Sequence, residues 1–300
     1  LSLHDALPIS CEKLASEHNP THRAHQRHQT LNTTELLNQA GQLCAVQLLS
    51  GAQALTHSGQ TGNGDVALDT LPLEMPAEHR RQVLESKLFK VDGDRCQPVH
   101  RSIAEYLAAR ELARRMREQA LPVARMLSLM CGDDGGIVQP LRGLHAWLAV
   151  HSPEHRRTLI EHDPLGIVLY GDVQRFTVSE KTHILQALEQ EARQFAWFRN
   201  GAWADHPFGA LGTPDMQETY ETLLNSPTRS DAHQALLDCV LDAIKHGNPL
   251  PALLPTLSRV VRDHSHAIHT RTNAAQAWLA QARHAGQDMQ IAKEWLTDLR

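Results

Sequence analysis

The sequence predicts a mainly α-helical protein, because of its composition, its helical periodicity and the marked ends of many segments. Hydrophobic residues make up 41% of the 300 residues and charged residues 21%, which is enough apolar material for a packed core. Aromatic residues account for only 4%, whereas Leu and Ala, both strong helix formers, dominate. A chain of 300 residues has room for about two domains.

Charge and cysteine content exclude several classes of protein. The net charge of -5 argues against a nucleic-acid-binding domain, which usually carries a basic face. No apolar run approaches the roughly 18–20 residues of a membrane span. The five cysteines lie far apart and form no CxxC motif: Cys11, Cys44, Cys96, Cys131 and Cys239. We therefore expect reduced thiols and a cytoplasmic protein.

Histidine is frequent, at 20 residues, and is densest between His18 and His28. A helix would bring His18, His22 and His25 near one face, as in some metal sites. Pro20 interrupts such a helix, and no Cys or carboxylate completes a ligand set. A solvated polar segment is therefore the favoured interpretation, and no metal site is predicted.

The first ten residues, LSLHDALPIS, are similar to the in-frame translation of a common sequencing adapter. We therefore expect residues 1–10 to be an artefact and exclude them from predictions of the fold. The same interpretation implies that further protein sequence stood upstream of Cys11.

Residues 11–68 are predicted to form a helical segment followed by a linker. Apolar residues recur at helical spacing from about Thr34 to Ala54. Residues 56–68, THSGQTGNGDVAL, are rich in Gly and match neither GxxxxGK[ST] nor GxGxxG, so they are interpreted as a loop rather than a phosphate cradle.

Residues 69–120 are predicted to form a small winged-helix-like unit. Pro76, followed by acidic and apolar positions, is typical of a helix start. Asp92-Gly93 follows a short apolar run and predicts a β-hairpin within residues 88–100. Ser102 and Glu105 have the spacing of a capping box and predict a helix to about Gln119.

Residues 121–300 are predicted to form stacked helical hairpins. The expected helices span residues 122–131, 137–150, 153–162, 177–195, 214–225, 230–246, 250–263, 267–285 and 287–298. Pairs recur about every 35–40 residues, as in HEAT-like α-solenoids. Expected N-caps are Ser152, Thr177 and Thr213, and expected C-caps are Gly247 and Gly286.

Several other motifs contain residue types that could carry chemistry. Asp133-Asp134 is followed by two glycines and is interpreted as a turn rather than a metal site. The DPLGIVLYGD stretch (163–172) is interpreted as a buried apolar run between turns. The aromatic residues of 195–208 predict a packed loop, with a partner-binding patch as the alternative. No GxSxG or HExxH occurs, although a Ser/His/Asp triad cannot be judged from sequence because its members lie far apart in a chain.

The segment PVHRSIAEYLAARELARRM (98–116) resembles the winged-helix end of NACHT-type STAND NTPases. Residues that match the family pattern F-x-H-x-S-F-Q-E-[YF]-x-A-A are His100, Ser102, Glu105, Tyr106, Ala108 and Ala109. Pro98, Ile103 and Ala104 depart from it, replacing two aromatic residues and a Gln. The match is strong over about 20 residues, and the order of elements extends it to about 110.

The resemblance implies a nucleotide-controlled switch. In that family the winged helix holds ADP in a closed state, a His contacts the phosphate, and exchange for ATP leads to oligomerisation. His100 would then be the phosphate contact, and ADP or ATP with Mg²⁺ would be the cofactor of the intact protein. The Walker A lysine and Walker B carboxylates are absent from this chain, so we expect the fragment itself not to be an enzyme.

Three hypotheses follow. The first is a regulatory and sensor fragment of a NACHT-like STAND NTPase, acting in signal transduction or antiphage defence, whose helical repeats bind a ligand or protein partner. The second is a HEAT-like scaffold for protein–protein interaction with no nucleotide role. The third is an α-helical enzyme of another kind. A helix, a hairpin and a helix packed together over residues 75–120 would favour the first over the second.

Overall fold

The computed structural model describes residues 3–16, 31–56, 62, 64–71, 73, 75–195, 198, 207–227, 230–286, 292 and 295. These residues are mainly α-helical, with one small sheet, as the sequence predicts. The chain divides into two compact units, residues 1–171 and 172–300. None of the helices among the described residues is long and apolar enough to cross a bilayer.

Unit 1 begins with α1 (Leu3–Ala15) and α3 (Thr33–Ser50). Asn32 and Glu35 form a reciprocal capping box at the start of α3, which the sequence analysis missed. The helix ends earlier than predicted, because Gly51 takes a left-handed φ of 68° and its amide bonds back to the last turn. Helix α1 crosses the boundary between the adapter-like residues and Cys11, which leaves the origin of residues 1–10 a prediction.

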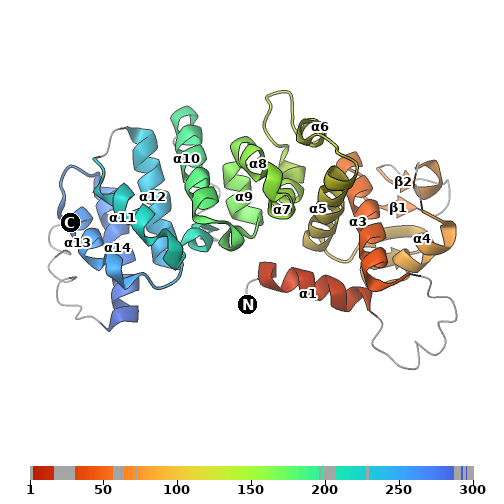
Figure 1. Ribbon diagram of the computed structural model, residues 1–300, viewed down its shortest axis with the longest axis horizontal. Helices are drawn as coiled ribbons and strands as arrows, with labels where there is room; N and C mark the ends of the chain where they lie inside the picture. Colours follow the sequence, from red (N-terminus) through yellow and green to blue (C-terminus); the bar gives the residue numbers. More distant parts are fainter. Residues whose placement is uncertain are drawn as a thin grey trace. The chain divides into compact units, whose positions relative to one another are not determined.

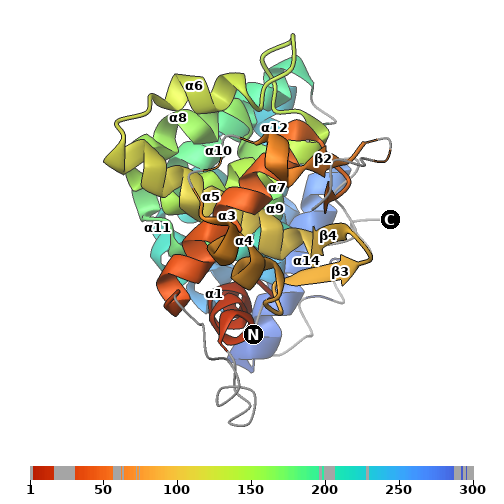
Figure 2. The same ribbon diagram turned by 90° about the vertical axis from the view of Figure 1, so that its right-hand side faces the viewer.

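The sheet has four strands in the order β2-β1-β4-β3: β1 (Leu55–Thr56), β2 (Val66–Ala67), β3 (Phe89–Asp92) and β4 (Arg95–Pro98). The predicted hairpin is confirmed as the antiparallel pair β3–β4, with Gly93 at φ 60° in its turn. Figure 2 shows this hairpin as two adjacent arrows. The short strands β1 and β2 lie in and beside the predicted linker, which is therefore not all loop. Residues 57–61 and 63 of that linker lie outside the described residues.

The predicted order of helix, hairpin and helix is confirmed: α4 (Ala77–Leu84), then β3–β4, then α5 (Arg101–Glu118). The predicted capping box at Ser102 and Glu105 is wrong. Helix α5 starts one residue before Ser102, His100 is its N-cap, and the Glu105 side chain pairs with Arg101 instead. The N-cap side chain of α5 is therefore the His100 imidazole and not the Ser102 hydroxyl that the sequence pattern predicted.

Helix α5 is the centre of unit 1. It packs most extensively against α3, then against α7, and also contacts β4 and α1. The close pairing of α3 and α5 is visible in Figure 1. The rest of the unit is α6 (Val123–Ser128), α7 (Arg142–His151), α8 (Arg156–His162) and α9 (Pro164–Tyr170).

Unit 2 contains α10 (Val178–Gln194), α11 (Gln217–Asn225), α12 (Asp231–His246), α13 (Leu254–Arg262) and α14 (Ile268–Ala285). Helix α12 packs between α10 and α14, while α13 packs against α14 and touches α11. The predicted helix 287–298 lies mostly outside the described residues.

The predicted helix ends are partly right. Thr177 and Glu180 form the expected capping box, and Gly286 is a left-handed C-cap at φ 63°. Ser152 and Thr213 are N-caps followed by Pro, as predicted, but they start short 3₁₀ turns and their side chains make no capping bond. Gly247 has a φ of -88°. It is needed for space rather than for a left-handed turn, because a Cβ there would lie 2.5 Å from Gly212 Cα.

The five cysteines are free, as predicted, and four of them are buried. Burial is the main cause that raises the pKa of the Cys11 thiol to about 12. The same cause raises the pKa of Cys44 further. Both thiols are therefore protonated at neutral pH and unreactive as nucleophiles.

Substituting Gly41 tests the contact between α3 and α5. A Cβ at Gly41 would lie 2.5 Å from the Leu107 carbonyl oxygen and 2.8 Å from Glu111 Cβ. Gly→Ala inside a helix normally stabilises a protein by about 0.5–1 kcal/mol. Here we expect Gly41→Ala to lower the free energy of unfolding by about 1–3 kcal/mol, because the backbone of α5 at Leu107 must move to make room for the new Cβ. Urea unfolding measures the change.

The neighbouring Gln42→Ala is the matched control, since it adds no atoms to the contact. We expect it to change the free energy of unfolding by less than about 0.5 kcal/mol. A stabilising Gly41→Ala would contradict the described distance between α3 and α5.

Candidate functional site

The candidate site is the N-terminal end of α5, where the sequence analysis placed His100. Strand β4 ends at Pro98, which pairs with Phe89. The next amide, of Val99, donates to the Leu88 carbonyl oxygen at 2.9 Å. His100 follows in extended conformation, at φ -150° and ψ 143°, and α5 starts directly after it. The hairpin therefore fixes where the imidazole lies.

The His100 ring caps α5 through one nitrogen. Its Nδ1 accepts a hydrogen bond from the Ser102 amide at 3.2 Å. A ring nitrogen that accepts must carry a lone pair, so the neutral ring holds its hydrogen on Nε2. His100 is exposed, and its Nε2 has no partner within the described residues. The site thus presents one N–H donor to solvent at the positive end of an 18-residue helix.

Arg101 lies beside His100 and was not identified from the sequence. Its Nε donates to Glu105 Oε1 at 2.7 Å, and its Nη2 donates to the Pro140 carbonyl oxygen. The Arg–Glu spacing of four residues on a helix was the available signal. These bonds tie the first turn of α5 to the segment that leads into α7, so the His100 end is held from two sides.

Glu105 is the buried member of this group, 8% exposed. Burial raises its pKa, and the hydrogen bond from Arg101 and the nearby positive charges only partly offset that effect. Its carboxyl group lies over Gly143 of α7, where an added Cβ would be 2.3 Å from Oε2. Glu105 is therefore a packing residue between α5 and α7 rather than a group available to a ligand.

The apolar part of the DPLGIVLYGD stretch is buried from Leu165 to Val168, as predicted, but it forms the short helix α9, so Asp163 starts a helix rather than a turn. Asp163 caps α9 by accepting from the Gly166 amide at 2.8 Å. Its two carboxylate oxygens also receive a bidentate pair of bonds from Arg142, at 2.7 and 2.8 Å. Arg142 lies over the Tyr170 ring, with its guanidinium carbon 5.9 Å from the ring centroid. Every group in this cluster is paired, which makes it a structural clamp between α7 and α9.

His145 lies one turn further along α7 and is fully buried. Burial lowers the pKa of its imidazole to about 4, even though Asp163 acts in the opposite direction. His145 is therefore neutral at pH 7 and belongs to the core.

The remaining sequence candidates yield no second site of this kind. The histidines of 18–28 lie outside the described residues, as do Trp197 and Trp203. Asp134 accepts from the Gly136 amide at 3.0 Å in a turn with Gly135 at φ 78°, as the loop interpretation predicts. Within the described ranges, no group of three His, Cys, Asp or Glu side chains could hold a metal ion.

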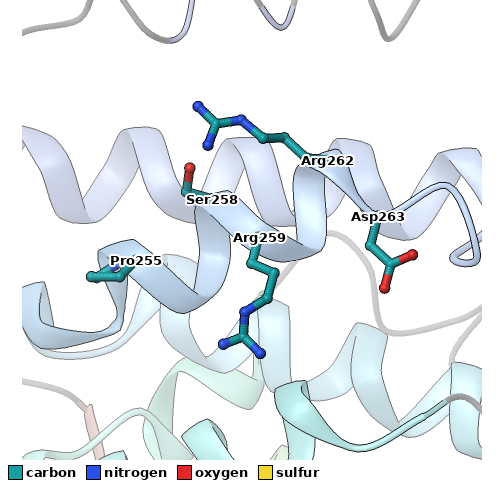
Figure 3. Close-up of a pocket in the computed structure, with 5 residues that line it drawn as sticks. All are labelled: Pro255, Ser258, Arg259, Arg262 and Asp263. Atoms are coloured by element: carbon teal, nitrogen blue, oxygen red, sulfur yellow. The ribbon is translucent and has the colours of Figure 1, made fainter.

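A shallow hollow of about 500 Å³ lies on α13 and is lined by Pro255, Ser258, Arg259, Arg262 and Asp263. Figure 3 shows Arg259 and Arg262 pointing away from each other on opposite sides of the helix. Arg262 lies over the Trp295 ring, 6.0 Å from its centroid. The two guanidinium groups do not converge, so they do not form a binding site for one anion.

No family model, curated protein or solved structure matches the chain. Its function must therefore be inferred from its own residues.

Acidification tests the buried state of His145. Because the folded pKa of about 4 lies below the unfolded value of about 6.5, the neutral ring contributes stability above pH 6.5 that is lost as the pH falls toward 4. We expect the free energy of unfolding to drop by about 2–3 kcal/mol from this residue between pH 6.5 and 4.5. Urea unfolding at the two pH values measures the drop.

His145→Gln should remove most of that pH dependence, whereas the same change at the exposed His264 should leave it in place. An equal drop in the wild type and His145→Gln would show that His145 is not held neutral by burial.

Proposed function

We propose that this chain is a regulatory and sensor fragment of a NACHT-like STAND NTPase, in which His100 contacts a nucleotide phosphate. The observation that carries the proposal is the double role of His100. Its Nδ1 caps α5, which leaves the Nε2–H donor exposed at a helix N-terminus. A phosphate oxygen is the natural acceptor for such a donor.

The order of elements supports a winged-helix unit around this site. Helix α3, strand β1, helix α4 and the β3–β4 hairpin follow one another along the chain. Strands β1, β4 and β3 form an antiparallel sheet in that order, so the hairpin acts as the wing. Helix α5 leaves the wing directly, at the position that the family pattern assigns to the helix that carries the histidine.

In the proposed mechanism, ADP bound to an upstream nucleotide domain accepts the Nε2–H bond and holds that domain against the winged unit. Exchange for ATP with Mg²⁺ breaks this contact, and the intact protein assembles into an oligomer. Signal transduction or defence against phage is the proposed setting. The fragment supplies the clamp and the sensor, and the residues that hydrolyse ATP belong to the upstream domain.

The packing of unit 2 supports a helical-repeat sensor and equally favours the second candidate function. Helices α10, α12 and α14 form one row, in which each packs on the next, while α11 and α13 lie in a second row. Two rows of antiparallel helices are typical of HEAT-like solenoids. A plain scaffold that binds a protein partner would have the same rows and no nucleotide role for His100.

Recovering the coding sequence upstream of Cys11 separates the two candidates. A Walker A motif on a predicted strand–helix unit is expected, and the intact protein should then copurify with ADP, which chromatography of the denatured protein measures. Further helical repeats with no phosphate loop would contradict the proposal and leave the scaffold.

Two His100 variants of the intact protein then test the phosphate contact. Asn is a good N-cap, so His100→Asn keeps the cap of α5 but lacks the imidazole donor. We expect His100→Asn and His100→Ala both to release ADP about tenfold faster or more, because a hydrogen bond to a charged group contributes about 1.5–3 kcal/mol. Fluorescent ADP displacement measures the rate.

His155→Asn is the matched control, since His155 precedes α8 without a capping bond. It should release ADP at the wild-type rate. Wild-type retention in His100→Asn, with loss only in His100→Ala, would mean that His100 is a cap alone.

A further inference from the structure

A groove of about 940 Å³ opens in unit 2 where the C-terminal ends of α10 and α11 meet the first turn of α12. Its lining combines apolar and polar side chains from all three helices: Glu189, Ala192, Arg193, Gln194, Leu223, Ser226, Ser230, Asp231, Ala232 and His233. No motif in the sequence points to this groove, and the site at His100 belongs to the other unit.

Three of the lining side chains form a chain of polar contacts. His233 Nε2 lies 3.1 Å from Ser226 Oγ, and His233 Nδ1 lies 3.6 Å from Glu189 Oε1. The imidazole is buried, with its side chain 8% exposed, while Ser226 is partly exposed in the groove. A hydroxyl, an imidazole and a carboxylate are thus lined up in the order that nucleophilic catalysis requires.

We propose that Ser226, His233 and Glu189 form a catalytic triad that hydrolyses uncharged carboxylic esters. Glu189 lies in α10, Ser226 directly follows α11, and His233 lies in the first turn of α12. This inference is independent of the proposed nucleotide switch.

The hydroxyl of Ser226 has two acceptors to choose between. In the resting state it donates to the Leu223 carbonyl oxygen at 2.6 Å. A rotation about Cβ–Oγ points the same hydrogen at His233 Nε2, which carries a lone pair when the neutral ring holds its hydrogen on Nδ1. Glu189 favours that tautomer, because its carboxylate faces Nδ1. The contact of 3.6 Å is loose, as acid–base contacts often are before substrate binds.

The reaction balances without a cofactor. Ser226 Oγ adds to the ester carbonyl carbon while its proton passes to His233 Nε2, and Glu189 stabilises the imidazolium. The carbon–oxygen bond to the alcohol breaks, and the alcohol leaves with the proton from His233. Water then adds to the acyl-serine, again with His233 as the base, and releases the carboxylic acid and the free serine.

The charges around the groove define the class of substrate. The first amides of α12, at Asp231 and Ala232, have no acceptor within the helix, and both residues line the groove, so the positive end of α12 lies at the proposed site. Asp231 also lines the groove and adds a negative charge there. Arg193 lies 3.8 Å from Glu189 Oε1, so the positive charge of Arg193 is partly offset by Glu189. An uncharged ester fits this balance better than an anionic one.

The test uses the full 300-residue chain, p-nitrophenyl acetate as the substrate and a fluorophosphonate as the covalent probe. The Ser226 oxygen displaces fluoride from phosphorus, which mass spectrometry of the digested protein locates. We expect the label on Ser226 in the wild type. Ser226→Ala and His233→Gln should each lower the rate of ester hydrolysis about 100-fold or more. Glu189→Gln should lower it less and change its dependence on pH.

Ser86→Ala is the matched control. Ser86 lies just after the end of α4 and makes the same hydroxyl bond to a carbonyl three residues back, also at 2.6 Å, but without a histidine contact among the described residues. It should remain unlabelled, and its loss should leave the rate unchanged. Absence of the label from Ser226 in the wild type would overturn the proposal without any variant. So would an ester hydrolysis rate that Ser226→Ala leaves intact.

Discussion

The close approach of α3 and α5 at Gly41 is the constraint on which unit 1 depends. The Leu107 carbonyl oxygen and the Glu111 side chain occupy the space that any Cβ at Gly41 would need. Glu111 is 2% exposed and is neutralised by Arg114 and Arg115, at 2.7–2.8 Å, so a buried carboxylate can lie in this contact. With α5 fixed by α3 on one side and by α7 on the other, its first turn has one position. Strand β4 delivers His100 to that position.

Within each unit, hydrogen-bonded and ion-paired side chains join neighbouring helices, in addition to apolar packing. In unit 2, the buried Lys181 ammonium bonds to Thr213 Oγ1 at 2.8 Å and to the Asp215 carboxylate at 3.0 Å. Burial alone would raise the pKa of Asp215, but the hydrogen bonds from Thr213 and Lys181 outweigh it and lower that pKa. Asp238 similarly joins α12 to α14 by accepting from Thr270 and Asn273. Such pairs fix the register of neighbouring helices, because a buried charge that loses its partner is strongly destabilising.

Local sequence signals predicted most helices and the hairpin, and they failed where a contact from another element decides the outcome. Asp92-Gly93 was enough to predict the β3–β4 turn, because the turn geometry depends on those residues alone. Strands of two residues carry no periodicity, so β1 and β2 were missed. At the start of α5, Ser102 and Glu105 have the spacing of a capping box, yet the Glu105 carboxylate bonds to Arg101 and packs over Gly143. The contacts between Ser226, His233 and Glu189 depend on how three helices pack, which spacing along the chain cannot show.

The functional account rests on a histidine that is a structural cap and a ligand donor at the same time. Only the neutral ring with its hydrogen on Nε2 can play both parts, so the tautomer of His100 is the most direct test. Long-range ¹H–¹⁵N correlation spectra of the ring, assigned with His100→Asn and recorded where the ring is neutral, report which nitrogen is protonated. The account predicts a lone pair on Nδ1 and hydrogen on Nε2. Hydrogen on Nδ1 would contradict it, because the ring could then neither cap α5 nor donate from Nε2 to a phosphate.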